Sequence, residues 1–153
     1  MRFFELKNFT DYNLLLFSQN IIDKCENLMS YYKNIFKNLP YSCILLEKKK
    51  DVFVIKEANT FYCKITHING DELRGKMIEE VFPENPLSSG LKEIQESLEI
   101  AYTNQESHKI DVLRYDLYDG QNDIYKLKYW EIENIPFFDK PKNTRYIFKL
   151  CVE

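Results

Sequence analysis

A long run of regularly spaced apolar residues near the start of the chain constrains its fold more than any other feature. Between residues 11 and 39, apolar side chains recur at alternating steps of three and four, the spacing of one face of an α-helix. This line consists of Leu14, Ile21, Cys25, Leu28, Tyr32, Ile35 and Leu39, with polar Ser18 among them. A second line, Leu15, Ile22, Met29 and Phe36, repeats every seven residues beside it. The pattern predicts a helix that Thr10 or Asp11 caps and that ends before Pro40, because proline cannot continue a helix.

The width of this apolar stripe leaves two interpretations of the helix open. Two adjacent lines cover more of the helix surface than the narrow seam of a minimal coiled coil. The helix could pack entirely on its own domain, or one line could face the domain while the other pairs with a second copy of the chain. We favour the second interpretation and expect a homodimer whose helix contacts come from Leu14, Ile21, Leu28, Tyr32 and Ile35. The chain then divides into a dimerisation helix, residues 1–39, and a second domain, residues 40–153.

After Pro40 the apolar period changes to two, the period of β-strands. Two short strands are expected on either side of three consecutive lysines, Lys48 to Lys50, which we interpret as a solvated hairpin turn. Three more strands are expected near the C-terminus, with turns at Asp119-Gly120 and at Asp139 to Asn143. The five predicted strands are 41–47, 51–57, 108–117, 124–137 and 144–152.

The middle of the chain reads as helical. Asn59 is placed to cap a short helix that carries Phe61 and Ile65 inward, with Tyr62 as a further inward candidate. Asn69-Gly70 predicts a turn. Residues 88–104 predict a longer amphipathic helix. This order of elements favours an α+β fold, in which the central helices cover one face of a five-stranded antiparallel sheet. The N-terminal amphipathic helix is left for the other face or for a partner.

Composition and charge exclude several function classes. The 153 residues include only four glycines and carry a net charge of −3, which argues against a glycine-rich phosphate loop and against a basic nucleic-acid-binding face. The four cysteines, Cys25, Cys43, Cys63 and Cys151, are too widely spaced for a zinc site or a dense disulfide scaffold. Because no catalytic set and no metal cluster is visible, we do not expect an enzyme. The absence of a secretion signal and of a long apolar stretch predicts a cytoplasmic domain without membrane contact.

Several segments, taken in order, resemble the PAS domain, a small sensory module of signalling proteins. ANTFYCKIT at 58–66 and NGDELRGKMIEEVFPENP at 69–86 are similar to the family's asparagine-capped helix and to the stretch that follows it. The last three strands of the family resemble VLRYDLYDG at 112–120, KYWEIENIPFFD at 128–139 and RYIFKLCVE at 145–153. The likeness is closest to PAS domains of bacterial sensor histidine kinases and covers residues 40–153. The lysines of the first hairpin and the glycine-free turn DKPKNT depart from the family pattern.

The resemblance implies a pocket between the inner face of the sheet and the central helices, which in this family holds haem, flavin, a small metabolite or nothing. Haem is not expected, because helix 88–104 lacks a histidine and His67 and His108 read as surface or packing residues. Covalent flavin chemistry is not expected, because Cys63 lies in Tyr-Cys-Lys rather than Asn-Cys-Arg. The strand periodicity does not decide which face points inward. The candidate pocket residues are Phe61, Tyr62, Ile65, Leu98, Leu113, Arg114, Tyr115 and Trp130.

These inferences together predict a sensory and dimerisation module, of the kind found as the N-terminal PAS domain of a two-component sensor histidine kinase. It would relay the state of a ligand or partner to a downstream signalling domain through flanking helices. Any kinase activity would lie in a domain beyond Glu153. Two alternatives stay open. One is a ligand-free protein–protein adaptor, and the other is a small α+β cone enzyme acting on an apolar substrate, which would need a buried catalytic acid or His–Asp pair.

Overall fold

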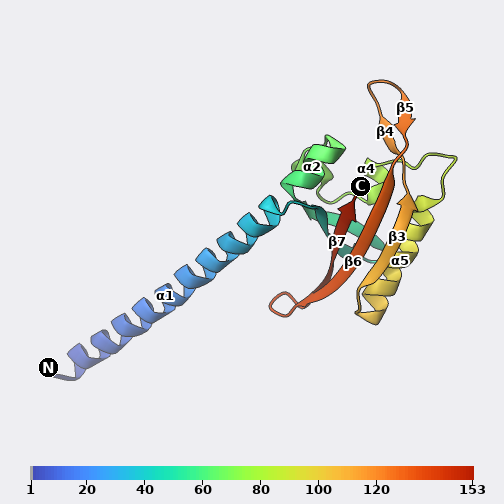
Figure 1. Ribbon diagram of the computed structural model, residues 1–153. Helices are drawn as coiled ribbons and strands as arrows, with labels where there is room; N and C mark the ends of the chain where they lie inside the picture. Colours follow the sequence, from blue (N-terminus) through green and yellow to red (C-terminus); the bar gives the residue numbers. More distant parts are fainter. Residues whose placement is uncertain (1) are drawn as a thin grey trace. The chain divides into compact units, whose positions relative to one another are not determined.

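The computed structural model describes the chain from residue 2 to residue 153, and its side chains except those of residues 2–15, 17 and 25. The described chain forms two compact units, one ending at Phe36 and one running from Lys37 to Glu153. The first unit is made by helix α1 (Arg2–Asn38), and the second holds all the strands and the remaining helices (Figure 1).

Helix α1 begins earlier than the sequence pattern predicts. It starts at Arg2 instead of at a cap on Thr10 or Asp11, and it runs for 37 residues. That early start was missed because cap-forming residues also occur inside helices, and residues 2–38 contain no glycine or proline to stop the helix. Most of the described apolar side chains of α1 are exposed, including Ile21 (47%), Leu28 (56%) and Ile35 (48%), while Phe36 is partly buried. The side chains of Leu14, Leu15 and Cys25, which belong to the predicted stripe, lie outside the described residues.

The second unit is built on a five-stranded antiparallel sheet in the order β2-β1-β7-β6-β3 (Figure 1). Its strands are β1 (Ser42–Lys49), β2 (Val52–Ala58), β3 (His108–Arg114), β6 (Tyr129–Asp139) and β7 (Thr144–Val152). The last strand in the chain, β7, therefore lies in the centre of the sheet between β1 and β6. This arrangement confirms the predicted α+β fold with a five-stranded antiparallel sheet.

Two of the predicted strands are interrupted. Instead of continuous strands over 108–117 and 124–137, the chain leaves the main sheet after Arg114 and forms a separate two-stranded ribbon of β4 (Leu117–Asp119) and β5 (Ile124–Lys126). The break lies at Asp116, whose buried carboxylate accepts hydrogen bonds from Arg114, Asn85 and the Lys128 amide. A carboxylate held by three donors replaces the strand pairing at this point, so the prediction of unbroken strands was wrong.

A β-bulge decides which residues of β3 face inward. The register against β6 shifts between Ile110 and Leu113, and a bulge moves the following side chains to the opposite face. Ile110 and Leu113 therefore both lie on the inner face, opposite Ile132 and Trp130. Strict alternation along the strand would place these two residues on opposite faces of the sheet, because it takes no account of the extra residue in the bulge.

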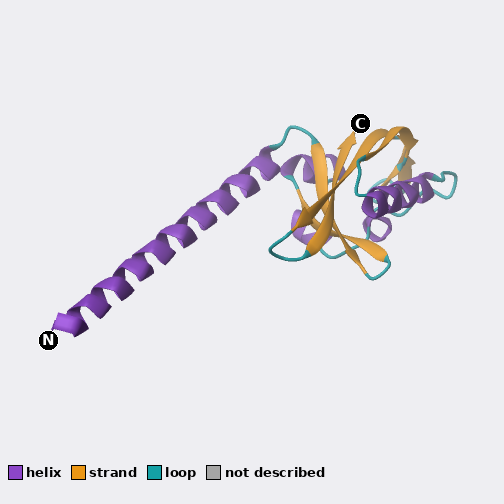
Figure 2. Ribbon diagram, turned by 90° about the horizontal axis from the view of Figure 1, so that it is seen from below, coloured by secondary structure: helices purple, strands orange, loops and turns teal. Residues whose placement is uncertain are grey.

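Four helices follow β2 and cover the inner face of the sheet (Figure 2). They are α2 (Thr60–Thr66), α3 (Gly70–Leu73), α4 (Ile78–Val81) and α5 (Gly90–Asn104). Asn59 caps α2 as predicted, but the buried side chain of that helix is Tyr62, while Phe61 is 42% exposed. The predicted turn at Asn69-Gly70 is instead the start of α3, since the Asn69 side chain caps that helix.

Two close contacts hold α5 on the sheet. Strand β1 extends to Lys49, so Lys48 does not lie in a solvated turn as predicted. Its amine reaches the Glu99 carboxylate of α5 at 2.7 Å and lies over the rings of Phe53 and Tyr102. At the other end of α5, a Cβ on Gly90 would lie 2.3 Å from the Arg114 carbonyl oxygen. Only glycine lets the helix approach the end of β3 this closely.

Candidate functional site

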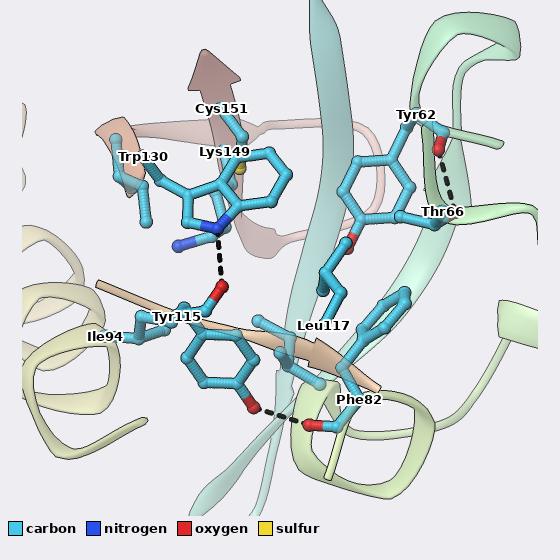
Figure 3. A pocket seen from close by; sticks show the side chains of 11 residues that line it. Tyr62, Thr66, Phe82, Ile94, Tyr115, Leu117, Trp130, Lys149 and Cys151 are labelled. Atoms are coloured by element: carbon cyan, nitrogen blue, oxygen red, sulfur yellow. Dashed lines mark hydrogen bonds between the residues drawn. The ribbon is translucent and has the colours of Figure 1, made fainter. Parts of the chain in front are cut away.

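A small cavity lies where the inner face of the sheet meets the helices. It has a volume of about 40 Å³, room for about three water-sized groups. Its walls come from three helices, α2, α4 and the first turns of α5, and from three strands, β4, β6 and β7 (Figure 3). The lining residues are Tyr62, Thr66, Ile78, Phe82, Ile94, Tyr115, Leu117, Trp130, Ile132, Lys149 and Cys151. Aromatic and aliphatic groups dominate the lining, which is typical of small-molecule sites.

Asn59 holds the α2 side of the cavity in place. Its fully buried amide oxygen accepts hydrogen bonds from the Tyr62 amide at 2.9 Å and the Cys43 amide at 3.2 Å. Its amide nitrogen donates to the carbonyls of Tyr41 at 2.7 Å and Leu39 at 3.4 Å. One side chain therefore joins the first turn of α2, strand β1 and the segment that follows α1. The position of Tyr62 is coupled to that segment through a single rigid group.

Two of the aromatic side chains of the cavity, Tyr115 and Trp130, are held by hydrogen bonds to main-chain carbonyls. The Trp130 indole donates to the Tyr115 carbonyl at 2.8 Å, and the Tyr115 hydroxyl donates to the Phe82 carbonyl (Figure 3). The Tyr62 and Phe82 rings meet edge to face, with centroids 6.1 Å apart. Because the Trp130 indole and the Tyr115 hydroxyl already donate to carbonyls, these two side chains shape the walls of the cavity and offer no free donor to a ligand.

Lys149 is the exceptional residue of the cavity. It is 3% exposed, and its amine is buried without a hydrogen-bond partner among the described residues. Figure 3 shows the amine beside the indole of Trp130. Burial lowers the pKa of Lys149 below its ordinary value, and the neighbouring Cys151 thiol only opposes this effect. An ammonium group without a partner is costly in such a place, so burial favours the neutral form of this amine.

The thiols and phenols around Lys149 are held in their neutral forms. Burial raises the pKa of Cys151, against a smaller opposite effect of Lys149. Burial also raises the pKa of Tyr62 and of Tyr115. A cysteine needs its thiolate form to act as a nucleophile, so the arrangement favours binding over covalent chemistry.

A row of polar side chains lies next to Lys149 on the same face of the sheet. Lys149 is directly opposite Asn134 of β6, and the Asn134 amide donates to the Ser97 hydroxyl of α5 at 2.8 Å. Ser97 in turn lies 2.8 Å from Nδ1 of His108. The Asn134 amide oxygen has no partner among the described residues. An unpaired acceptor and an unpaired donor thus occupy facing positions on neighbouring strands.

The structure brings three of the predicted pocket residues together at the cavity, namely Tyr62, Tyr115 and Trp130. The others lie elsewhere. Phe61 is exposed, Ile65 and Leu113 pack with the core, and the exposed Arg114 pairs with Asp116. Leu98 lines a second hollow of about 260 Å³ between the start of β2 and α5.

Sequence reasoning missed Lys149 and Cys151. A signal for both was present, because strand alternation places them on one face with Ile147. The central position of β7, which makes that face a buried one, follows only from the pairing of distant strands.

Neither a metal centre nor a membrane segment is found in the part of the chain that the structure describes. No group of three or more His, Cys, Asp or Glu side chains in residues 2–153 with described side chains could hold a metal ion. Among the described helices, none is long and apolar enough to cross a membrane.

Comparison with known proteins is informative at the level of structure. No protein-family model matches the sequence, and no curated protein matches it. The PAS domain of an HTR-like protein from Haloarcula marismortui superposes with a TM-score of 0.63 at 17% identity, covering 88% of this chain and 98% of that one. The PAS domain of nitrogen regulation protein NR(II) from Vibrio parahaemolyticus gives a TM-score of 0.54 at 13% identity, with 78% and 94% covered.

A third similar structure is the LOV domain of a blue-light activated histidine kinase from Erythrobacter litoralis. Its TM-score is 0.54 at 14% identity, and the match covers 75% of this chain and 96% of that one. Identities this low establish the fold and not the ligand. The strand order, the asparagine-capped helix and these superpositions together identify the chain as having the PAS fold.

Proposed function

We propose that the chain is a sensory and dimerisation module of a signalling protein, in which occupancy of the cavity controls the segments that flank the PAS fold. The observation that carries this proposal is the apolar cavity with a buried amine that has no partner among the described residues. A purely structural core gains nothing from such a group. A binding site gains a polar contact that fixes the orientation of a ligand.

The contacts around the cavity supply a route for the signal. Tyr62 lines the cavity, and its amide is bonded to Asn59, which also holds the Leu39 and Tyr41 carbonyls. Cys151, the next-to-last residue of β7, lines the same cavity. A ligand that displaces Tyr62 therefore acts on the segment that follows α1, and a ligand that displaces β7 acts on the C-terminal side of the fold. A coupling of about 1–3 kcal/mol is enough to shift a two-state output several-fold.

A sensor histidine kinase is the output system that we favour. The similar structures include a PAS domain of a nitrogen regulation protein and a LOV domain of a histidine kinase, and the sequence resemblance points the same way. In this assignment the chain itself is a non-catalytic cytoplasmic input domain, and catalysis belongs to a domain beyond Glu153.

The second part of the proposal is that α1 forms a homodimer. Its described apolar side chains at Ile21, Leu28, Tyr32 and Ile35 are all between 47% and 61% exposed, and their heptad spacing suits pairing with a second copy. Light scattering should give twice the chain mass for the wild type and a monomer for the Ile21→Ser/Ile35→Ser variant. Ser30→Asn is the matched control, because nine residues from Ile21 place it on the opposite side of the helix. A wild-type monomer would contradict this part.

Native mass spectrometry of the protein purified from its host tests the sensory function. We expect a small molecule that is released on denaturation. A mass equal to the polypeptide alone, with a co-purified protein in its place, would contradict the sensory proposal and favour the adaptor alternative. The outer face of the sheet is the surface that an adaptor would use, since Phe137 and Val152 are more than 40% exposed there.

A further inference from the structure

The cavity is lined by one titratable amine and, among the described residues, by no carboxylate. Lys149 contributes a buried amine, and the described residues that line the cavity include no Asp or Glu. The titratable groups that face it are the Cys151 thiol on its own strand and the phenols of Tyr62 and Tyr115 on the opposite walls. The pKa of each of these groups is raised by burial, so none of them supplies a negative charge at neutral pH. An occupant that balances the amine must bring its own negative charge.

The volume and the walls limit the size of this occupant. About 40 Å³ accommodates about three water-sized groups, which corresponds to a carboxylate with a short alkyl substituent. Ile94, Leu117 and Ile132 form apolar walls that suit an alkyl group. A dianion is disfavoured, because its second charge would be buried among these walls without a partner.

We propose that the cavity is a receptor site for a small monocarboxylate, of the size of acetate or propionate, whose oxygens accept hydrogen bonds from the Lys149 ammonium. The proposal rests on the sensory function proposed above and names its ligand class. Charge-assisted hydrogen bonds to a carboxylate are among the strongest available to a lysine. The alkyl group lies against the aliphatic walls.

Binding should be coupled to proton uptake. A carboxylate favours the ammonium form and raises the pKa of Lys149, which burial lowers in the free protein. The association constant is therefore largest below the pKa of the free protein and falls as the pH rises from that pKa to the raised value of the complex. The other groups that face the amine are Cys151, Tyr62 and Tyr115, and burial raises the pKa of all three.

Isothermal titration calorimetry with propionate, in two buffers of different ionisation enthalpy, tests the proposal. We expect saturable binding of propionate and a binding heat that differs between the buffers because of proton uptake. Uncharged propionamide should bind at least about tenfold more weakly than propionate. Lys149→Met and Lys149→Gln should both lose propionate binding. Lys142→Met, at an exposed lysine of the β6–β7 turn, should bind like the wild type. Circular dichroism establishes that each variant is folded.

Several outcomes would overturn the proposal. They are equal affinity for propionate and propionamide, unchanged binding by both folded Lys149 variants, and no binding of acetate or propionate by the wild type. If the last result accompanies release of a different small molecule in native mass spectrometry, only the ligand class is wrong. If neither experiment finds a ligand, the sensory function fails as well.

Discussion

Replacing Asn59 by alanine should remove the side chain that joins α2, β1 and the segment after α1. Asn59 is fully buried and makes four hydrogen bonds, two as acceptor and two as donor. In the alanine variant the amides of Tyr62 and Cys43 lose their acceptor, and the Tyr41 carbonyl loses its donor. No water can reach these groups without opening the junction between α2 and β1.

The expected cost follows from these contacts. Each buried amide left without a partner costs about 1–3 kcal/mol, and loss of a helix cap alone costs about 1 kcal/mol. Because the two amides share one acceptor and the site can relax in part, we expect a loss of about 3–5 kcal/mol in the free energy of unfolding. That is a large share of the ~5–15 kcal/mol typical of a folded domain.

Urea unfolding followed by circular dichroism measures this loss through the midpoint, with the slope of the transition unchanged. Asn69→Ala is the matched control, because Asn69 caps α3 from an exposed position through one hydrogen bond of 3.1 Å to the Asp71 amide. It should cost about 1 kcal/mol or less. If Asn59→Ala lowers the free energy of unfolding by no more than Asn69→Ala does, the buried Asn59 amide does not have the stabilising role that we assign to it.

Three further substitutions probe the fold around the cavity. Gly90→Ala should lower the free energy of unfolding by about 1–3 kcal/mol in urea titrations, because its Cβ meets the Arg114 carbonyl at 2.3 Å. Asp116→Asn should destabilise the fold at pH 7. The hydrogen bond from Arg114 lowers the pKa of Asp116 in the folded protein. The extra free energy of unfolding of the wild type should therefore be fully present above the pKa that Asp116 has in the unfolded chain. It should disappear as the pH falls through the lower pKa of Asp116 in the folded protein. Lys149→Met should raise the free energy of unfolding at pH 7 by about 1–3 kcal/mol by removing an unpaired buried donor, and a destabilised variant would show that the amine has a partner.

The local pattern of the sequence predicts the elements that depend on neighbouring residues. The cap at Asn59, the helix over 88–104 and the paired strands at either end follow from propensity, caps and periodicity, and the structure contains all of them. The order of the strands in the sheet was not predicted, because it depends on pairings between segments that are distant in the sequence. Local signals were sufficient wherever the deciding contact lies within a few residues along the chain.

Other features depend on contacts between distant segments, and the sequence pattern did not predict them. The break after Arg114 requires Asn85 and Lys128 to converge on Asp116. The bulge in β3 is defined only by its register against β6. Lys149 is a surface residue by type, and it is buried only because β7 occupies the centre of the sheet beneath the helices. For this reason Lys149, the main residue of the proposed site, was not among the predicted pocket residues.

The titration of the Lys149 amine tests the central claim most directly. Heteronuclear NMR of protein with labelled lysines follows each amine through its pKa, and Lys149→Met assigns the signal. We predict that Lys149 titrates below the ordinary lysine value of about 10.4 in the free protein, because burial lowers its pKa. Saturating propionate should then move this pKa upward. A Lys149 amine that titrates at the ordinary lysine value and does not respond to propionate would contradict the claim that an unpaired amine waits in this cavity for an anionic ligand.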